Sequence, residues 1–207
     1  TLHNTLFPYT TLFRSAFSAI GSMGTLLVAV AAFSPDATTA ALYYMVHSTF
    51  AAACLFLVAD LVVSRRSDDT LAAAPATAQN GLFAALFFAA AIAMAGMPPL
   101  SGFLGKLLVL DALRAPETLA WAWSAVLIGS LLTIVGFARA GSTLFWKSTA
   151  IPVPASQPDA APFPNARATE IAPVMAGLAT LFALAVFAGP LAAYLEATSA
   201  QIFDRAG

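Results

Sequence analysis

Charge is what this sequence has least of. Only 9% of its 207 residues are charged, whereas soluble domains carry about a quarter. Hydrophobic residues make up 60% of the chain, and the mean hydropathy is +0.84. The formal net charge is -1, and no run of basic residues interleaved with aromatics occurs, so nothing indicates a nucleic-acid partner. The composition therefore predicts an integral membrane protein in contact with the lipid bilayer.

Cysteine is nearly absent, and so are the patterns of common ligand sites. The one cysteine, Cys54, lies in an apolar stretch and is expected to act as a small hydrophobe. There is no Gly-rich phosphate loop, no cluster with metal-ligand spacing and no nucleophile beside a plausible base. We interpret "GSMG" at 21–24 as a helix-packing pattern. The sequence predicts neither a cofactor nor a metal.

An initiator methionine and a signal-peptide pattern are also lacking, and the chain begins at Thr1. We expect a fragment. Residues 1–15, "TLHNTLFPYTTLFRS", are polar and resemble a translated sequencing adapter, so we expect a non-native leader and give His3 and Arg14 no role. The remainder divides into a helical domain at 16–145, a proline-rich loop at 146–170, and a last helix with its tail at 171–207.

Long apolar runs are what the chain does contain. A helix needs about 20 apolar residues to cross about 30 Å of hydrocarbon. Five segments qualify as membrane spans in an all-α, polytopic protein: 16–33, 38–63, 82–114, 118–145 and 171–195. Small residues at helical spacing in the first span predict close helix packing; they are Ser18, Gly21, Ser22 and Thr25.

The third span contains two costly features, a double proline and a lysine. Pro98 and Pro99 follow Gly96 and interrupt the helical hydrogen-bond ladder, so we expect two half-helices. Lys106 is a charged amine within the apolar segment, which costs several kcal/mol or more. Broken helices are tolerated where they line a wet cavity, and transporters place ion sites beside them. Lys106 is therefore a candidate proton-transfer residue, although a lysine that snorkels or pairs silently remains an alternative.

His47 is the second candidate, near the middle of the second span. Imidazole titrates near neutral pH and can relay protons. Tyr43 and Tyr44 lie about one turn earlier on the same face. The alternative is a histidine that only packs and hydrogen-bonds to a neighbouring hydroxyl. Asp111 is a possible end of the relay, unless it pairs with Arg114 on its own helix.

The loops predict an orientation. Basic residues gather in the loops that join spans two to three and four to five, which fall on one side and are expected to be cytoplasmic. They are Arg65, Arg66, Arg139, Lys147 and Arg167, against Arg114 and Arg205 on the other side.

The segments with these residues resemble a known family. "AGMPPLSGFLGKLLVL" (95–110) resembles the lysine-bearing broken helix of the antiporter-like subunits of respiratory complex I and of Mrp-type (Mnh, Pha) cation/proton antiporters. "ALYYMVHSTFAAACLFLVADLV" (41–62) resembles the neighbouring histidine helix, and "AFSAIGSMGTLL" (16–27) the helix before it. "IGSLLTIVGFARAGSTLFW" (128–146) is most similar to the D subunits of the Mrp-type antiporters. The resemblance covers residues 16–195.

The resemblance implies a larger parent of about fourteen helices in two inverted repeats. This chain would be its last five helices, in the second repeat. Lys106 would be the ionisable residue of that repeat's proton path, and His47 would match the family's histidine. Many relatives have a lysine one turn after that histidine, where this sequence has Ala51. The first repeat is missing, so this piece alone is not expected to transport.

Three functions remain open at this stage. The leading hypothesis is a proton-translocating subunit of a multisubunit Na⁺ or K⁺/H⁺ antiporter, assembled with other subunits in a bacterial inner membrane and not itself an enzyme. The second is a proton-pumping membrane-arm subunit of an NADH-quinone oxidoreductase or a membrane hydrogenase. The third is a helical scaffold with an inert lysine, which predicts dry surroundings and an ion pair for Lys106.

Overall fold

The computed structural model describes residues 11–66, 73, 75, 77, 79–151 and 165–204, with side chains from Ser18 onward. In these ranges the chain is helical and contains no strand. Most of the leader, the Arg14 side chain, the prolines from 152 to 164 and Arg205 lie outside this description. Helix α1 (Thr11–Ala31) begins within the segment predicted as a leader.

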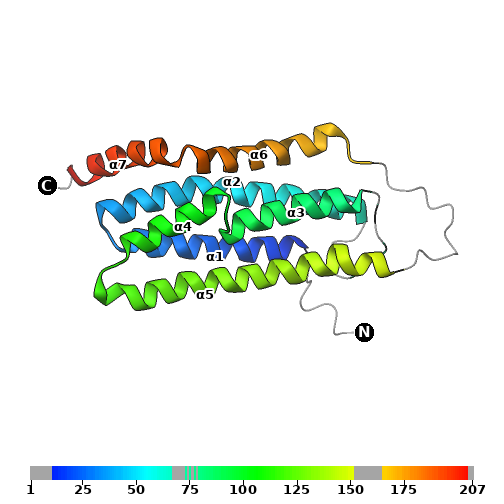
Figure 1. The fold of residues 1–207 in the computed structure, drawn as a ribbon, viewed down its shortest axis with the longest axis horizontal. Coiled ribbons are helices and arrows are strands. Elements are labelled where there is room, and N and C mark those ends of the chain that lie inside the picture. The colour runs from blue at the N-terminus through cyan, green and yellow to red at the C-terminus, as the bar shows by residue number, and fades with distance from the viewer. Residues whose placement is uncertain are drawn as a thin grey trace.

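The helices cross the molecule five times, alternating in direction (Figure 1). The first two passes are α1 and α2 (Pro35–Arg66). The third pass is the pair α3 (Asn80–Ala95) and α4 (Ser101–Ala112), and the fourth is α5 (Pro116–Gly141), extended by a π turn and a 3₁₀ turn to Ala150. The fifth pass is α6 (Ala168–Val186) followed by α7 (Ala188–Asp204).

Within the described ranges, three helical segments are each long and apolar enough to cross a membrane: Pro35–Arg66, Pro116–Ala150 and Ala168–Val186. The other two passes are built from shorter apolar helices, among them Ser18–Ala31 and Asn80–Ala95. Because α3 and α4 together make one pass, the discontinuous helix expected at Gly96, Pro98 and Pro99 is present in the structure.

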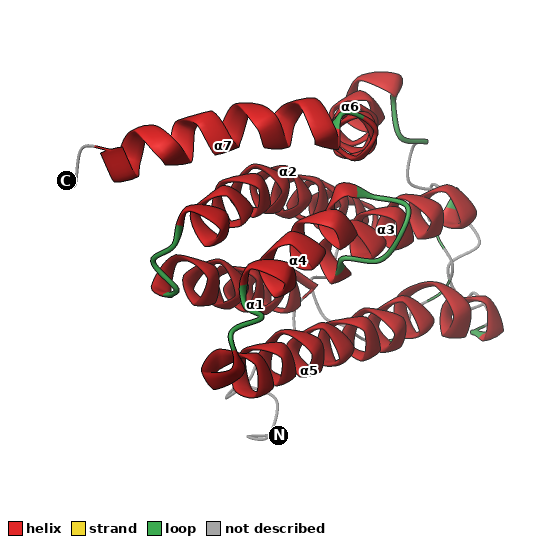
Figure 2. Ribbon diagram, turned by 60° about the vertical axis from the view of Figure 1, so that its left-hand side comes forward, coloured by secondary structure: helices red, strands yellow, loops and turns green. Residues whose placement is uncertain are grey.

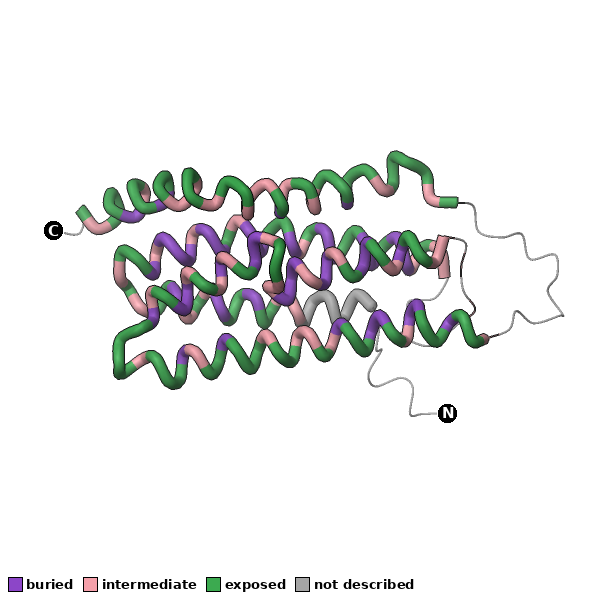
Figure 3. Tube along the Cα trace, viewed as in Figure 1, coloured by how far each residue is buried: buried purple, intermediate pink, exposed green. Residues whose placement is uncertain are grey.

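Helix α2 is the centre of the bundle. It contacts α1, α3, α4, α6 and α7, and Figure 2 shows it between the layer of α6 and α7 and the layers of α1 and α5. Its buried residues are small or aromatic along much of its length, which lets neighbours approach from several sides. By contrast, α5, α6 and α7 expose most of their surface (Figure 3), as expected of helices that face lipid or further protein.

A second interruption, which the sequence analysis did not predict, divides the segment 171–195. Helix α6 ends at Val186, and α7 begins at Ala188 and leaves in a different direction (Figure 2). Pro190 explains the break, because it has no N–H for the Val186 carbonyl and its ring clashes with that carbonyl in a straight helix. Two of the five passes are therefore broken.

The basic residues at the end of α2 and the start of α6 lie on one side of the bundle, as predicted. Arg65 and Arg66 end α2, and Arg167 caps the start of α6, at the same end of the bundle. There Arg65 forms an ion pair with Glu170. Arg114 lies in the connection between α4 and α5, at the opposite end.

Candidate functional site

The break in the third pass is a defined turn. Gly96 has a positive φ of 73°, the left-handed conformation that favours glycine. The Gly96 N–H donates to the Ala93 carbonyl and the Met97 N–H to the Ile92 carbonyl, each at 3.1 Å. This pattern is a Schellman motif, which closes the C-terminal end of α3. The Pro98–Pro99 peptide bond is cis, and the chain re-enters a helix at Ser101.

Lys106 folds back onto this turn. From the second turn of α4, its ammonium donates to the Ala95 carbonyl at 2.7 Å and to the Ser130 hydroxyl of α5 at 2.8 Å. Gly96 makes this path possible, because a Cβ there would lie 2.8 Å from Lys106 Cδ and 2.9 Å from Cε. The ammonium thus lies at the negative end of the α3 dipole, where a cation is stabilised.

The described residues provide no carboxylate partner for Lys106. Their ion pairs are Arg65 with Glu170 and Arg114 with Asp111. Neutral oxygen dipoles hold the amine instead, so the satisfied ion pair expected of an inert lysine is not found in this part of the chain.

A cavity lined in part by hydroxyl groups adjoins the amine. It has a volume of about 200 Å³, enough for several water molecules at about 30 Å³ each. Hydroxyl-bearing residues and glycines of α1 and α5 line most of it, with Tyr44 of α2 and Lys106 of α4; they include Ser18, Ser22, Thr25, Ser130 and Thr133. Hydroxyls spaced around a space of this size can hydrogen-bond water, and water can carry protons to the amine.

The small-residue stripe of the first span faces this cavity. A Cβ added at Gly21 or Gly24 would meet no atom within 4 Å. The packing predicted for "GSMG" at 21–24 is therefore not found at its two glycines, whereas Ser22 and Thr25 of the stripe are buried and α1 packs against α2. The stripe leaves room beside the hydroxyls of Ser22 and Thr25, which is what a hydrated cavity requires.

His47 lies at the other side of the break. The ring is buried, with 2% of its surface exposed, and its Nδ1 lies 2.9 Å from the hydroxyl of Ser101, the first residue of α4. Two glycines of α4 permit this approach. A Cβ at Gly102 would lie 2.7 Å from His47 Nε2, and one at Gly105 would lie 3.0 Å from the Tyr44 ring. Lys106 thus bonds the end of α3, and His47 contacts the start of α4.

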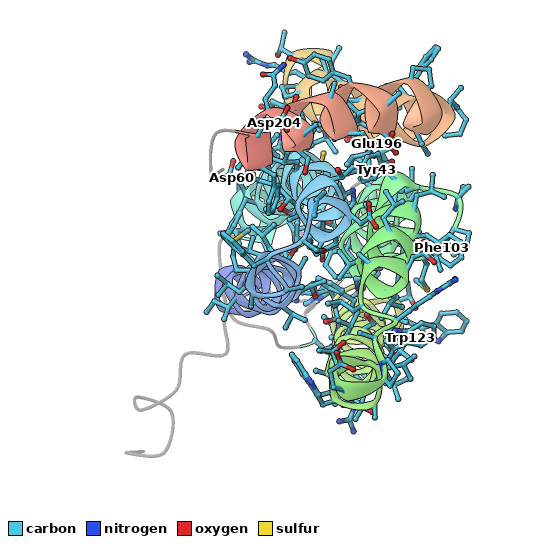
Figure 4. The ribbon with its side chains drawn as sticks, turned by 90° about the vertical axis from the view of Figure 1, so that its left-hand side faces the viewer. Tyr43, Asp60, Phe103, Trp123, Glu196 and Asp204 are labelled. Atoms are coloured by element: carbon cyan, nitrogen blue, oxygen red, sulfur yellow. The ribbon has the colours of Figure 1, made fainter. Side chains whose placement is uncertain are left out.

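The two tyrosines, predicted to share a face with His47, diverge. Tyr44 accepts a hydrogen bond from Ser22 at 3.1 Å and its ring lies 5.8 Å from that of His47, so it connects the cavity with the histidine. Tyr43 points toward the layer of α6 and α7 (Figure 4). There its hydroxyl donates to the Leu184 carbonyl at 3.0 Å.

Asp111 is not brought to the amine. It is exposed and pairs with Arg114, three residues later. The pairing within its own helix, one of the two alternatives for this residue, is the arrangement in the structure. Asp60 is also exposed, on the outer side of α2 (Figure 4).

Sequence reasoning missed Ser101 and Ser130. Ser101 is fully buried and is the first residue of α4, two positions after the double proline. Ser130 belongs to a second stripe of small residues in α5, with Gly129 and Thr133, that resembles the stripe of α1. If the small-residue stripes of α1 and α5 are assumed to face each other, they predict a polar space between the two helices.

Comparison with known proteins places this arrangement in a family. A family model described as "NADH:quinone oxidoreductase/Mrp antiporter, TM" matches residues 15–136, more than half of the chain. The chain belongs to this family. The match includes the second pass with His47, the broken third pass with Lys106, and Ser130 of α5.

Individual relatives agree with the assignment. The chain is 27% identical over 217 residues to a probable K(+)/H(+) antiporter D subunit of Rhizobium meliloti, a match with 89% of this chain and 38% of the relative. It is 36% identical over 136 residues to the NADH-quinone oxidoreductase N subunit of Granulibacter bethesdensis, which covers 58% of this chain and 26% of that protein. The chain thus spans well under half the length of these relatives.

The fold is shared with a solved membrane complex. A chain of the Mrp complex from Dietzia sp. DQ12-45-1b superposes with a TM-score of 0.71 at 22% sequence identity. The superposition covers 94% of this chain and 47% of the Dietzia chain. The all-α, polytopic antiporter-like fold expected from the sequence is therefore confirmed.

Proposed function

We propose that this chain is part of a proton-translocating membrane subunit of a multisubunit Na⁺ or K⁺/H⁺ antiporter. The observation that carries the proposal is the position of Lys106. Its ammonium lies at a helix break, beside a hydroxyl-lined cavity, and is held by neutral oxygens. An amine without a bound anion can lose and regain its proton without breaking an ion pair, and cavity water supplies the path.

His47 is the proposed second relay group. The Tyr44 ring lies between it and the cavity, and Ser101 fixes its Nδ1. A proton that leaves Lys106 can thus pass by water and hydroxyls toward the second pass. Because Ala51 stands where many relatives have a lysine, water and the tyrosine hydroxyl replace a second amine in this proposal.

The remaining assignments follow from the family. The partners are other antiporter subunits, protons, Na⁺ or K⁺, and lipid, and the location is the bacterial inner membrane. The chain acts as a transporter component and not as an enzyme. The names of the similar proteins, which include an antiporter D subunit, support these assignments.

A second candidate is a proton-pumping membrane-arm subunit of an NADH-quinone oxidoreductase. It is favoured by the identity of 36% to the Granulibacter N subunit. Purified complexes separate the two candidates, because only an oxidoreductase oxidises NADH in a quinone-dependent manner.

The test of the main proposal is a Lys106→Ala substitution in the full-length protein assembled with its partners in proteoliposomes. Cation-dependent proton flux is expected to disappear while the complex still assembles. Lys147 is the chain's other lysine, exposed in the 3₁₀ turn after α5, and Lys147→Ala is the matched control that should retain flux. Normal flux in the Lys106 variant would refute the proposal.

A further inference from the structure

The ligands of the Lys106 ammonium are two neutral oxygens, of kinds that also coordinate alkali cations. They are the carbonyl oxygen of Ala95, at the C-terminal end of a half-helix, and the hydroxyl oxygen of Ser130, at 2.7 and 2.8 Å. Half-helix C-terminal ends and carbonyls coordinate monovalent cations in membrane proteins, where they replace the ion's water shell. A lysine ammonium and a potassium ion are also similar in size and carry the same charge.

The surroundings fit such an ion. The cavity beside Ser130 provides room for the water molecules that would complete a coordination shell. Among the described residues no carboxylate lines that cavity or pairs with Lys106. The site therefore carries one positive charge held by dipoles alone, and a second cation cannot enter while the ammonium stays.

The groups that face Lys106 come from every neighbouring helix. Those of α1 and α5 are uncharged hydroxyls, and α3 contributes the Ala95 carbonyl. The titratable side chains are Tyr44, which lines the cavity, and His47, whose ring lies 5.8 Å from that of Tyr44. Both belong to α2, so a proton leaving the amine can pass to cavity water or to His47.

We propose that the Ala95 carbonyl and the Ser130 hydroxyl form a monovalent-cation site that Na⁺ or K⁺ and the protonated Lys106 occupy in turn. The exchange balances. The ammonium releases one proton, the neutral amine moves off the two oxygens, and one alkali cation takes its place, so the charge at the site is unchanged. This inference rests on the proposed antiporter function and supplies its coupling, since the cation binds only where a proton has left.

Proton release on salt addition tests the exchange. The protein in lipid nanodiscs, weakly buffered at a series of pH values, receives NaCl or KCl, with choline chloride as the control for ionic strength, and a pH-indicator dye reports free protons. Saturable release approaching one proton per chain is expected with Na⁺ or K⁺ only. The Lys106→Met variant should release none. Release that is equal in choline chloride, or that persists in Lys106→Met, would overturn the proposal.

Cation binding itself is measured by broadening of the ²³Na resonance that added K⁺ reverses. Lys106→Met should bind Na⁺ independently of pH, because the competing ammonium is gone. Adding Ser130→Ala should weaken this binding at least tenfold, whereas Ser130→Thr keeps the oxygen and should not. Thr198→Ala removes a hydroxyl that, like that of Ser130, bonds the carbonyl four residues earlier, but in α7. It is the matched control and should change nothing.

Two results of the binding series contradict the site: loss of Na⁺ binding in Lys106→Met, or undiminished binding after Ser130→Ala. Because Ser130→Thr is compared with Ser130→Ala, a folding defect of the alanine variant would not hide the answer. Lys106-dependent transport without cation binding would overturn the exchange site and leave the proposed function standing. Cation binding without Lys106-dependent transport would overturn the proposed function and leave the cation site standing.

Discussion

The Tyr43 hydroxyl lies 3.0 Å from the Leu184 carbonyl oxygen, so α2 is hydrogen-bonded to α6 where α6 is about to break. The bond falls in the last turn before Val186, where carbonyls lose their helical partners. Its neighbour Tyr44 contacts the cavity on the other side of α2. Of these two adjacent residues of α2, Tyr43 thus contacts the fifth pass and Tyr44 contacts the cavity.

Tyr43→Phe is expected to loosen the α6–α7 junction without disturbing the cavity. The Leu184 carbonyl would lose its partner, at a cost of about 1 kcal/mol. Hydrogen–deuterium exchange should increase in residues 184–191. Tyr44→Phe is the matched control, because its hydroxyl bonds Ser22 in α1, and it should leave exchange in that segment unchanged. An equal increase in both variants would contradict the assignment.

Gly96→Ala should displace Lys106 while leaving the lysine in place. The new Cβ would lie 2.8 Å from Lys106 Cδ, and a φ of 73° costs alanine about 1–2 kcal/mol. Proton flux in the assembled complex should fall toward that of Lys106→Ala. Gly81→Ala adds the same methyl group in the first turn of α3, where a Cβ would meet no atom within 4 Å, and should retain flux. Full flux in Gly96→Ala would show that the folded-back lysine is not required.

Ser101→Ala should impair His47 by removing the partner of its Nδ1. A hydrogen bond of about 1.4 kcal/mol corresponds to about a tenfold loss of flux. The ¹⁵N resonances of the His47 ring should shift as Nδ1 loses its partner. Ser148→Ala removes another buried hydroxyl, bonded to the Phe145 carbonyl far from the break, and should alter neither readout. An unchanged His47 spectrum in Ser101→Ala would refute the contact.

Gly177→Ala should separate α2 from α6. The added methyl would collide with the Cys54 sulfur, and overpacking of this kind costs about 1–3 kcal/mol. Cys54→Ala removes the obstacle, so the double variant should recover most of the stability lost by Gly177→Ala, as measured by thermal unfolding in detergent. Additive losses would mean that the two residues do not meet.

The elements that local chemistry determines were predictable. Five apolar segments gave the five passes, and the Gly96–Pro99 turn gave the broken third pass, because a double proline cannot continue a helix. The second break carries a similar signal in Gly189 and Pro190, but a single proline near the start of a helix is also compatible with an unbroken pass.

The partners of the candidate site could not be predicted in the same way. The fold of Lys106 back onto Ala95, and its contact with Ser130, depend on how α4 and α5 lie against the turn. Hydroxyl residues in apolar helices usually bond their own backbone, and the Ser130 hydroxyl also donates to the Val126 carbonyl. The spacing of residues along one helix does not reveal which of them face a neighbour.

The short length of α4 has a consequence for how the protein is made. A helix of 12 residues extends about 18 Å, well short of the hydrocarbon thickness of about 30 Å. Neither half of the third pass can therefore rest alone in lipid, with the carbonyls of the turn bare. Helix α2 leaves the ribosome first and contacts both α3 and α4. The order of synthesis therefore supplies a protein surface for the broken pass before that pass is made.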